Sequence, residues 1–417
     1  MPQNKQPCRR IAVWTQGVKL PGEVRGYTRF RKIAEVLSAA GFEVDLITSS
    51  FQHWDKAQRD TTAAQYQGLP YRIVFIDEPG YTKNLDLKRI ASHRKAAKNL
   101  ARYFANAQGE YALIYAEIPP NDCARVCAEA ARAASIPFVA DINDLWPEAM
   151  RMAVDVPVFS DIAFAPFARD ARAVYGMLDA AVGTSDEYAA RPTLDRSEPY
   201  EQITVYVGND LAEFDAGVAA HASEIEKPEG EVWVAYAGTL GASYDLETLI
   251  AALAACQEQV PGMRLKVLGD GPDRQALEHL VAALDAPVDF LGYVDYAHMA
   301  AWLSRCDICV NSLVAAAPQS IVTKIGDYLA AGRPVVNTGS SAEFRAKVEA
   351  DAFGVNVPAE DVGALAEALV GLALDAEGRA AMGVLAREIA ETQFDQEQSY
   401  QNIVHLIQSL VTKDAKS

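Results

Sequence analysis

The residues best suited by type and spacing to do chemistry lie between Pro318 and Val336. This stretch is expected to form a polar loop, a short helix, a Gly-Arg-Pro turn and a strand. Lys324 and Asp327 are three residues apart, so they share one face of that helix. Free backbone N–H groups, the positive end of the helix and an ammonium group favour a diphosphate, and a carboxylate one turn later suits ribose hydroxyls. The stretch therefore predicts a site for a nucleotide diphosphate with a group attached. The alternative is a surface helix whose Lys324 and Asp327 are simply solvated.

The elements that must position this stretch alternate between strands and helices along the whole chain. The expected strands are 10–14, 42–48, 71–76, 111–115, 137–142, 180–183, 203–207, 232–238, 263–268, 288–293, 307–310, 335–337 and 354–357. The main expected helices are 26–40, 87–104, 122–134, 245–256, 362–372, 377–392 and 396–412. Such alternation predicts an α/β fold, in which parallel strands are covered by helices on both faces.

The pattern restarts after a segment of polar and small residues between Val207 and Glu231, which we interpret as the domain boundary. We expect two doubly wound, Rossmann-like domains. The first is 1–208 together with the final helix, 396–412, which crosses back to it, and the second is 209–395. Ligands of such domains bind at the carboxyl ends of the strands, in the cleft where the two domains face each other.

Length, composition and charge limit the class of protein. The chain has 417 residues, half of them hydrophobic, which is enough for two buried cores. Its net charge of −18 argues against nucleic acid as a partner. No apolar run is long enough to cross a bilayer, and no apolar signal core precedes the first strand. We therefore expect a cytoplasmic protein.

The six cysteines lack the dense spacing of a disulfide scaffold. Cys306 and Cys309 form a C-x-x-C pair at the start of an apolar strand, and Cys123 and Cys127 share one helical face. Because no second pair of cysteines or histidines is nearby in the sequence, we expect buried thiols here and not a zinc or redox site. No cluster of histidines and acids in the sequence points to a metal, so none is expected.

The segment from Lys88 to Gln108 is basic in an otherwise acidic chain. It contains no acid and six basic residues: Lys88, Arg89, Arg94, Lys95, Lys98 and Arg102. Apolar residues recur at helical spacing from Leu87 to Phe104. Two interpretations remain open. A basic amphipathic helix over 87–104 can lie on an anionic membrane surface, or the same helix can pack its apolar stripe on a sheet and leave its lysines in water.

The stretch from Gln319 to Val336 resembles the donor-binding signature of nucleotide-sugar glycosyltransferases of family 4, which have the GT-B architecture of two Rossmann-like domains. In that family two glutamates separated by seven residues precede a run of small residues and Gly-x-Pro-Val-Val, and here Gln319 and Asp327 hold the two acidic positions. Further landmarks follow in the family's order. They are Tyr236-Ala-Gly238-Thr239-Leu240, Leu268-Gly269-Asp270-Gly271-Pro272, Phe290-Leu-Gly292-Tyr293 and, in the first half, Asp141-Ile-Asn-Asp144-Leu-Trp-Pro147. The last landmark and Thr323-Lys324-Ile325 are similar to a subgroup that builds bacterial surface polysaccharides.

The resemblance implies a retaining glycosyltransferase. Such an enzyme moves a sugar from a nucleotide-diphosphate sugar, for example a UDP-sugar, to a saccharide acceptor, expected here to be lipid-linked at the inner face of the plasma membrane. It implies neither a cofactor nor a metal. The implied donor-sugar residues are Gln319, Ser320, Ile321, Val322 and Thr323, and the phosphate residues are Arg25, Gly26, Gly238, Thr239 and Lys324. The implied nucleoside residues are Gly269, Gly271, Tyr293 and Asp327, and the implied catalytic residues are Asp141, Asp144 and Lys324.

Some features leave alternatives open. Many family members carry cations in the loop that follows the first strand of the donor domain, but 239–244 has none, so Lys324 would have to act with Arg25 or Arg29. Asp141 and Asp144 would line the acceptor side as general base or hydroxyl anchor, or they would only cap the next helix. A sugar-nucleotide epimerase of the same architecture and a non-catalytic sugar-nucleotide-binding subunit are the two alternative functions.

Overall fold

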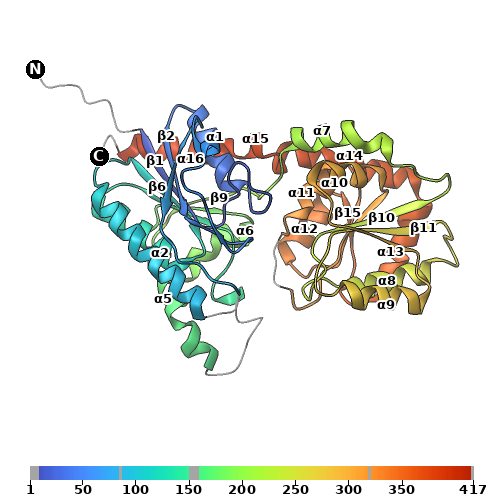
Figure 1. The fold of residues 1–417 in the computed structure, drawn as a ribbon. Coiled ribbons are helices and arrows are strands. Elements are labelled where there is room, and N and C mark those ends of the chain that lie inside the picture. The colour runs from blue at the N-terminus through green and yellow to red at the C-terminus, as the bar shows by residue number, and fades with distance from the viewer. Residues whose placement is uncertain (1–8, 84–86, 150–158, 318–320, 415–417) are drawn as a thin grey trace, which may run out of the picture. The chain divides into compact units, whose positions relative to one another are not determined.

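The computed structural model describes residues 9–83, 87–149, 159–317 and 321–414. The contacts within the chain divide it into two compact units, both α/β (Figure 1). Unit 1 comprises the chain up to Tyr206 and the segment from Ser399 onwards, and unit 2 is the continuous segment Val207–Gln398. No described helix is both long and apolar enough to cross a membrane.

Unit 1 is built on a parallel sheet of seven strands in the order β5-β2-β1-β6-β7-β8-β9. The strands are β1 (Arg10–Thr15), β2 (Glu43–Ser49), β5 (Arg72–Ile76), β6 (Leu113–Ile118), β7 (Phe138–Ile142), β8 (Ala180–Gly183) and β9 (Glu201–Thr204), and a small hairpin is formed by β3 (Phe51–Gln52) and β4 (Ala57–Gln58). The helices are α1 (Arg29–Ala39), α2 (Leu87–Asn106), α3 (Asn121–Ala134), α5 (Phe159–Met177), α6 (Asp186–Ala190) and α16 (Gln401–Asp414). The predicted α/β class is confirmed.

Alternate residues of β1 point to opposite faces of this sheet, as the period of a strand requires. Ala12 and Trp14 belong to a core covered by α2, α3 and α5. Ile11 and Val13 belong to a second core, covered by α1 and by α16, which begins at Gln401. The helix at the end of the chain therefore packs on unit 1.

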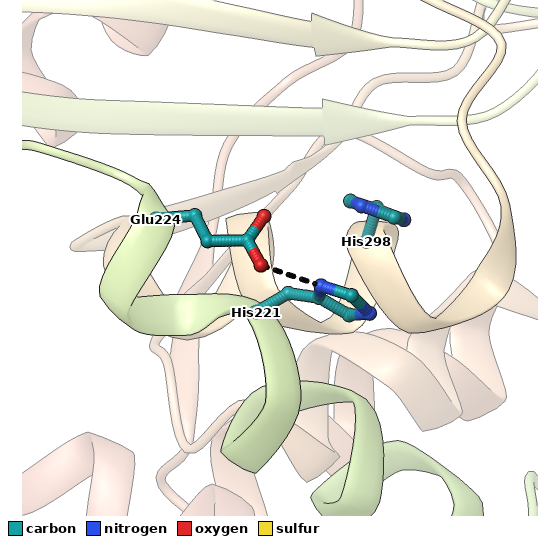
Figure 2. A group of neighbouring side chains, drawn as sticks. All are labelled: His221, Glu224 and His298. Carbon is teal, nitrogen blue, oxygen red and sulfur yellow. Dashed lines mark hydrogen bonds and ion pairs between the residues drawn. The ribbon is translucent and has the colours of Figure 1, made fainter.

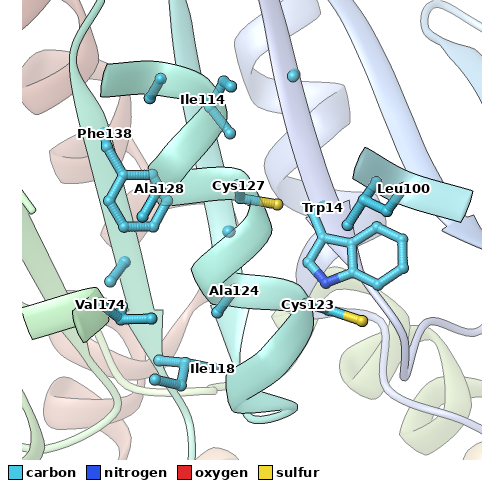
Figure 3. Close-up of a cluster of buried hydrophobic side chains, with 14 of the residues drawn as sticks. Trp14, Leu100, Ile114, Ile118, Cys123, Ala124, Cys127, Ala128, Phe138 and Val174 are labelled. Atoms are coloured by element: carbon cyan, nitrogen blue, oxygen red, sulfur yellow. The ribbon is translucent and has the colours of Figure 1, made fainter. Parts of the chain in front are cut away.

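The core under α2, α3 and α5 contains the two cysteines of α3 (Figure 3). Cys123 and Cys127 are fully buried beside Trp14 and form no disulfide. Burial raises the pKa of both thiols well above the ordinary value. Cys306 and Cys309 are likewise free and fully buried. The prediction of buried thiols is confirmed for these four residues.

Unit 2 is built on a parallel sheet of six strands in the order β12-β11-β10-β13-β14-β15. The strands are β10 (Val232–Ala237), β11 (Met263–Leu268), β12 (Val288–Gly292), β13 (Ile308–Asn311), β14 (Val335–Asn337) and β15 (Gly354–Asn356). The helices are α7 (Leu211–His221), α8 (Leu246–Cys256), α9 (Arg274–Leu284), α10 (Tyr296–Arg305), α11 (Lys324–Ala330), α12 (Ala342–Ala350), α13 (Val362–Leu374), α14 (Ala376–Ile389) and α15 (Gln396–Ser399). One face of the sheet is covered by α8 and α13, whose leucines fill a fully apolar core.

Several helices differ from the sequence-based expectation. The first begins at Arg29 and not at Gly26, because Gly26 has a φ of +129° and Tyr27 forms a bridge to Val18. Helix α5 was not expected, and it has Pro166 in its interior. Helix α7 lies in the segment that was interpreted as a polar boundary.

Candidate functional site

Two glycine turns meet at the carboxyl end of the unit 2 sheet. Gly238 follows β10 with a φ of +147°, and Gly269 follows the neighbouring β11 with a φ of +145°. A Cβ at Gly269 would lie 1.9 Å from the Gly238 carbonyl oxygen, and a Cβ at Gly271 would lie 2.1 Å from that of Leu240. The turns therefore pack backbone against backbone, which only glycine allows. The Gly238 N–H donates to the Leu268 carbonyl. Of the two predicted phosphate residues, Gly238 and Thr239, Thr239 is therefore the better hydrogen-bond donor for a phosphate.

Lys324, the first residue of α11, projects toward the same turn. A Cβ at Gly238 would lie 2.9 Å from Lys324 Nζ. The ammonium group lies 4.0 Å from the ring centres of both Tyr236 and Tyr244. It is buried, and among the described residues it has no hydrogen-bond partner. Burial lowers the pKa of Lys324 well below its ordinary value. The alternative of a simply solvated Lys324 is therefore wrong.

This environment is unusual for a lysine. Aromatic faces attract a cation, but they do not replace the hydrogen bonds that an ammonium group makes in water. A buried cation that lacks a counter-charge is stabilised by any anion that reaches it. The position of Lys324 beside a glycine turn therefore suits an anion such as a phosphate.

Asp327 lies one turn further along α11 and is held through one of its oxygens. Its Oδ1 accepts hydrogen bonds from Tyr296 Oη at 2.9 Å and from Asn209 Nδ2 at 3.2 Å. No hydrogen bond to Oδ2 is described. Burial raises the pKa of Asp327 to about 6, although both hydrogen bonds act in the opposite direction. Protein groups thus orient the carboxylate through Oδ1.

The other predicted donor residues divide into described and undescribed ones. Gln319 and Ser320 lie outside the described residues. Ile321 and Val322 are partly and fully buried, respectively, and Thr323 is exposed. Tyr293 follows Gly292 at the end of β12, and 69% of its surface is exposed. Its ring is therefore available to stack on a planar ligand.

In unit 1, the predicted catalytic Asp141 is fully buried in an ion pair. Arg29 Nε lies 3.0 Å from Asp141 Oδ2, and both side chains are almost inaccessible. Arg29 Nη1 also donates to the carbonyls of Val205 and Tyr206. The two charges therefore neutralise each other inside the unit, where breaking a buried pair costs several kcal/mol. Arg29 is therefore engaged inside unit 1, and Asp141 has a structural contact as the partner of Arg29 and not as the helix cap of the alternative.

The other predicted residues of unit 1 are more accessible. Arg25 is exposed, and its carbonyl accepts from Gln52. Asp144 accepts from the Leu145 backbone N–H at 2.8 Å and from Trp146 Nε1 at 3.0 Å, and burial raises its pKa. Asp144 thus stabilises its own loop. Arg25 is thus exposed beside Gly26, whose φ of +129° lies in the region that favours glycine.

The structure also reveals polar groups that the sequence analysis missed. Asn311, Asn337 and Asn356 are in register at the ends of β13, β14 and β15, and each donates to the next through side-chain amides at 2.9 and 2.8 Å. In unit 1, Glu117 at the end of β6 accepts from Thr15 Oγ1 and from two backbone N–H groups. Burial raises the pKa of Glu117 to about 7. Both sets lie at carboxyl ends of strands, which is the signal that could have found them.

A hollow of about 600 Å³ occurs at the other end of α11, next to Gly332 and Arg333. Its arginines are already engaged. Arg387 pairs with Asp215, and Arg379 donates to two backbone carbonyls. We therefore place the candidate site at Lys324 and Asp327 and not in this hollow.

Comparison with known proteins gives one family and one fold. Residues 231–375 match the family model "Glycosyl transferases group 1". No curated protein has a sequence that matches the chain significantly. Sucrose-phosphate synthase from Thermosynechococcus elongatus superposes with a TM-score of 0.71 at 19% identity, over 97% of this chain and all of that one. Anabaena HepE in complex with UDP gives 0.70 at 18% identity, over 96% of this chain and all of that one. WaaG, a glycosyltransferase involved in lipopolysaccharide biosynthesis, gives 0.64 at 15% identity, over 94% and 98% of the two chains.

The family match covers Gly238, Gly269, Lys324 and Asp327, the residues that form the site in unit 2. The structural matches span both units, and they confirm the predicted GT-B fold of two Rossmann-like domains. The resemblance found in the sequence is thereby confirmed. Residues 231–375 carry a group 1 glycosyl transferase domain, which identifies a glycosyltransferase, and the whole chain has a GT-B fold.

Proposed function

We propose that this glycosyltransferase is a retaining enzyme of family 4. It transfers a sugar from a UDP-sugar to a lipid-linked saccharide. The product belongs to the synthesis of a surface polysaccharide. The observation that carries the proposal is the Lys324 ammonium group, which is buried beside the Gly238 turn and has no described hydrogen-bond partner. A diphosphate supplies the missing negative charge and the missing acceptor oxygens.

The choice of UDP is supported by a structural relative. Anabaena HepE has been solved with UDP, with UDP and glucose, and with UDP-glucose. In the present chain the phosphates would contact Lys324 and the Thr239 N–H, and Asp327 Oδ2 would accept from a ribose hydroxyl. Tyr293 and the turns at Gly269 and Gly271 would contact the nucleoside. The donor sugar would bind at 319–323.

The reaction needs little covalent chemistry from the protein. The acceptor hydroxyl oxygen forms a bond to the anomeric carbon while the bond from that carbon to the diphosphate oxygen breaks, and the leaving diphosphate takes the hydroxyl proton. Charge accumulates on the diphosphate as the bond breaks. Lys324, which has lost its hydration already, stabilises that charge without reorganisation of solvent. In this scheme Asp141 holds Arg29 in place, and Asp144 orients the loop that it caps.

The acceptor is proposed to be presented at an anionic membrane surface, and the exposure of α2 supports this. Lys88, Arg94, Lys95, Lys98 and Arg102 are all exposed, and Leu87 is 81% exposed at the start of the helix. The opposite face, with Ala96, Leu100 and Phe104, is buried in the core. Each basic residue near an anionic surface contributes about 1 kcal/mol of attraction. The participation of WaaG in lipopolysaccharide biosynthesis agrees with an acceptor of this kind.

One experiment separates this proposal from its alternatives. The protein is incubated with UDP-sugars, with and without lipid-linked saccharide, and products are separated by mass. Transfer that needs the acceptor supports the proposal, and a product that keeps the donor's anomeric configuration supports retention. Turnover without acceptor would indicate an epimerase, and binding without turnover would indicate a non-catalytic subunit. No binding of any nucleotide sugar would refute the assignment of the site.

A further inference from the structure

Three side chains that can bind a metal meet on the surface where α7 and α10 pack together in unit 2 (Figure 2). His221 is the last residue of α7, Glu224 ends the short turn that follows it, and His298 lies in the first turn of α10. One ligand atom from each of the three lies within 4.8 Å of the other two. Two imidazoles and one carboxylate form a donor set typical of transition-metal sites. This cluster could not be expected from the sequence, because His298 comes from a segment distant from His221 and Glu224.

The packing of the two helices fixes the backbone that carries these ligands. A Cβ at Gly217 would lie 2.7 Å from the Cα of Ala297, so α7 and α10 touch through their backbones. The rings of Phe214 and Tyr296 meet edge to face with centres 6.4 Å apart. The packing of the two helices therefore brings the two histidines together.

The hydrogen bonds of the imidazoles show how the cluster takes up an ion. His298 Nδ1 lies 2.8 Å from Asp295 Oδ2, and a carboxylate that holds one imidazole nitrogen while the other nitrogen binds the ion is the usual support of a metal-bound histidine. His221 Nδ1 lies 3.1 Å from Glu224 Oε1, so an ion bound by these two atoms takes the place of the proton that they share.

The stacking of the rings and the exposure of the side chains select the class of ligand. The two imidazoles stack with centres 4.0 Å apart and planes 22° apart. Two imidazolium charges at this separation would repel each other, whereas a single cation attracts both neutral rings. Zn–N bonds of about 2.0–2.1 Å place tetrahedral ligand atoms about 3.3 Å apart, so no pair of ligand atoms needs to close by more than about 1.5 Å. The side chains of His221, His298 and Glu224 are 28%, 43% and 59% exposed, which leaves them free to rotate.

We propose that His221, Glu224 and His298 bind one divalent transition-metal ion, of which Zn²⁺ matches the ligands best, with water completing the coordination. The ion joins the end of α7 to the start of α10. Its consequence is greater stability of unit 2. Ca²⁺ and Mg²⁺ prefer all-oxygen ligands and do not substitute for it.

The test uses the full-length, tag-free protein with Cys8→Ser, because the thiol of Cys8 is itself a zinc ligand and lies outside the described residues. The protein is treated with a chelator and dialysed. Zinc chloride is titrated into it by calorimetry, and the melting temperature is measured with and without the metal. We expect one ion per chain and a melting temperature raised by a few degrees, as a ligand of the folded state requires. His221→Ala and His298→Ala should each weaken the affinity for Zn²⁺ at least ten-fold. Magnesium chloride should leave the melting temperature unchanged.

His279→Ala is the matched control, because His279 is exposed on α9 of the same unit and belongs to no ligand group among the described residues. It should bind Zn²⁺ like the parent protein. His221→Gln and Glu224→Gln replace the alanine variants if those are poorly folded, and they should weaken the affinity in the same way. The proposal is overturned if the His221 and His298 variants bind Zn²⁺ as tightly as the parent, or if His279→Ala loses as much affinity as they do.

Discussion

Replacing Lys324 by methionine should make the free protein more stable and at the same time weaken its binding of UDP. Methionine has nearly the length of lysine but no charge, so it can occupy the space between the rings of Tyr236 and Tyr244. A buried polar group without a partner costs about 1–3 kcal/mol, and more when it is charged. We therefore expect the free energy of unfolding of unit 2 to rise by about 1–3 kcal/mol in Lys324→Met. For a unit of this size the melting temperature should rise by about 2–4 °C for each kcal/mol.

Ligand binding should change in the opposite direction. A charge-assisted hydrogen bond contributes about 1.5–3 kcal/mol, so UDP should bind Lys324→Met about 10- to 150-fold more weakly than the wild type. Scanning calorimetry measures both effects in one series. The transition that UDP shifts in the wild type is the transition of unit 2, and isothermal titration gives the affinity.

The gain in stability should also depend on pH, with a sign fixed by the depressed pKa of Lys324. In the unfolded chain this lysine keeps its ordinary pKa of 10.5. Between the depressed value and 10.5 the unfolded state binds more protons, so the stability of the wild type rises with pH across that window. The methionine variant lacks this rise. The extra stability of Lys324→Met over the wild type should therefore be largest below the depressed pKa of Lys324 and should shrink toward pH 10.5.

Lys266 provides the matched control. It is also buried in unit 2 and lies 4.0 Å from the centre of a tryptophan ring, but its ammonium group pairs with Asp289 at 2.6 Å. Lys266→Met should therefore not stabilise the protein and should leave UDP binding unchanged. The reasoning is refuted if Lys324→Met is no more stable than the wild type and binds UDP equally well.

Three further predictions test other parts of the molecule. Asp327→Asn should weaken the binding of free UDP while the fold persists, because a ribose hydroxyl loses a charged acceptor; equal affinities in titration calorimetry would exclude Asp327 from the site. Glu117→Gln should flatten the pH dependence of the stability of unit 1. The pKa of Glu117 is raised from 4.5 to about 7, so the stability that its proton confers is complete below pH 4.5 and is lost as the pH rises through 7. The loss in the wild type should be about 3 kcal/mol between pH 4.5 and 8 by urea unfolding, and a variant with the same slope would contradict this. Charge reversal at Lys95, Lys98 and Arg102 should abolish co-sedimentation with anionic vesicles at low salt; equal sedimentation with neutral vesicles would argue for a soluble acceptor.

Most of the fold could be predicted from the sequence, because a parallel strand that is covered on both faces reads as a short apolar run. Helix α7 could not, since its buried residues are only Leu211, Phe214 and Gly217, and the rest of the segment is small or acidic like a linker. The end of β6 was also missed. The strand expected at 111–115 continues to Ile118 through Glu117, a charged residue of low strand propensity.

The candidate site was predictable in its residue types but not in its contacts. Spacing alone placed Lys324 and Asp327 on one helical face, and the resemblance added the glycine turns. The partners of Asp327 could not be inferred, because Asn209 and Tyr296 come from two other segments of unit 2. The role expected of Arg29 depended on its exposure, and its burial against Asp141 could not be read from residues 112 positions apart.

The return of α16 to unit 1 has a consequence for how the protein is made. Tyr400, Ile403 and Ile407 are fully buried in the core that also contains α1. During translation these residues leave the ribosome only after all of unit 2, whose segment is continuous. Unit 2 can therefore fold as soon as it emerges, while unit 1 waits with one apolar face of its sheet uncovered. The half of the molecule that is synthesised first is thus the half that is completed last, and chaperones have the longest access to the face formed by α1 and β1.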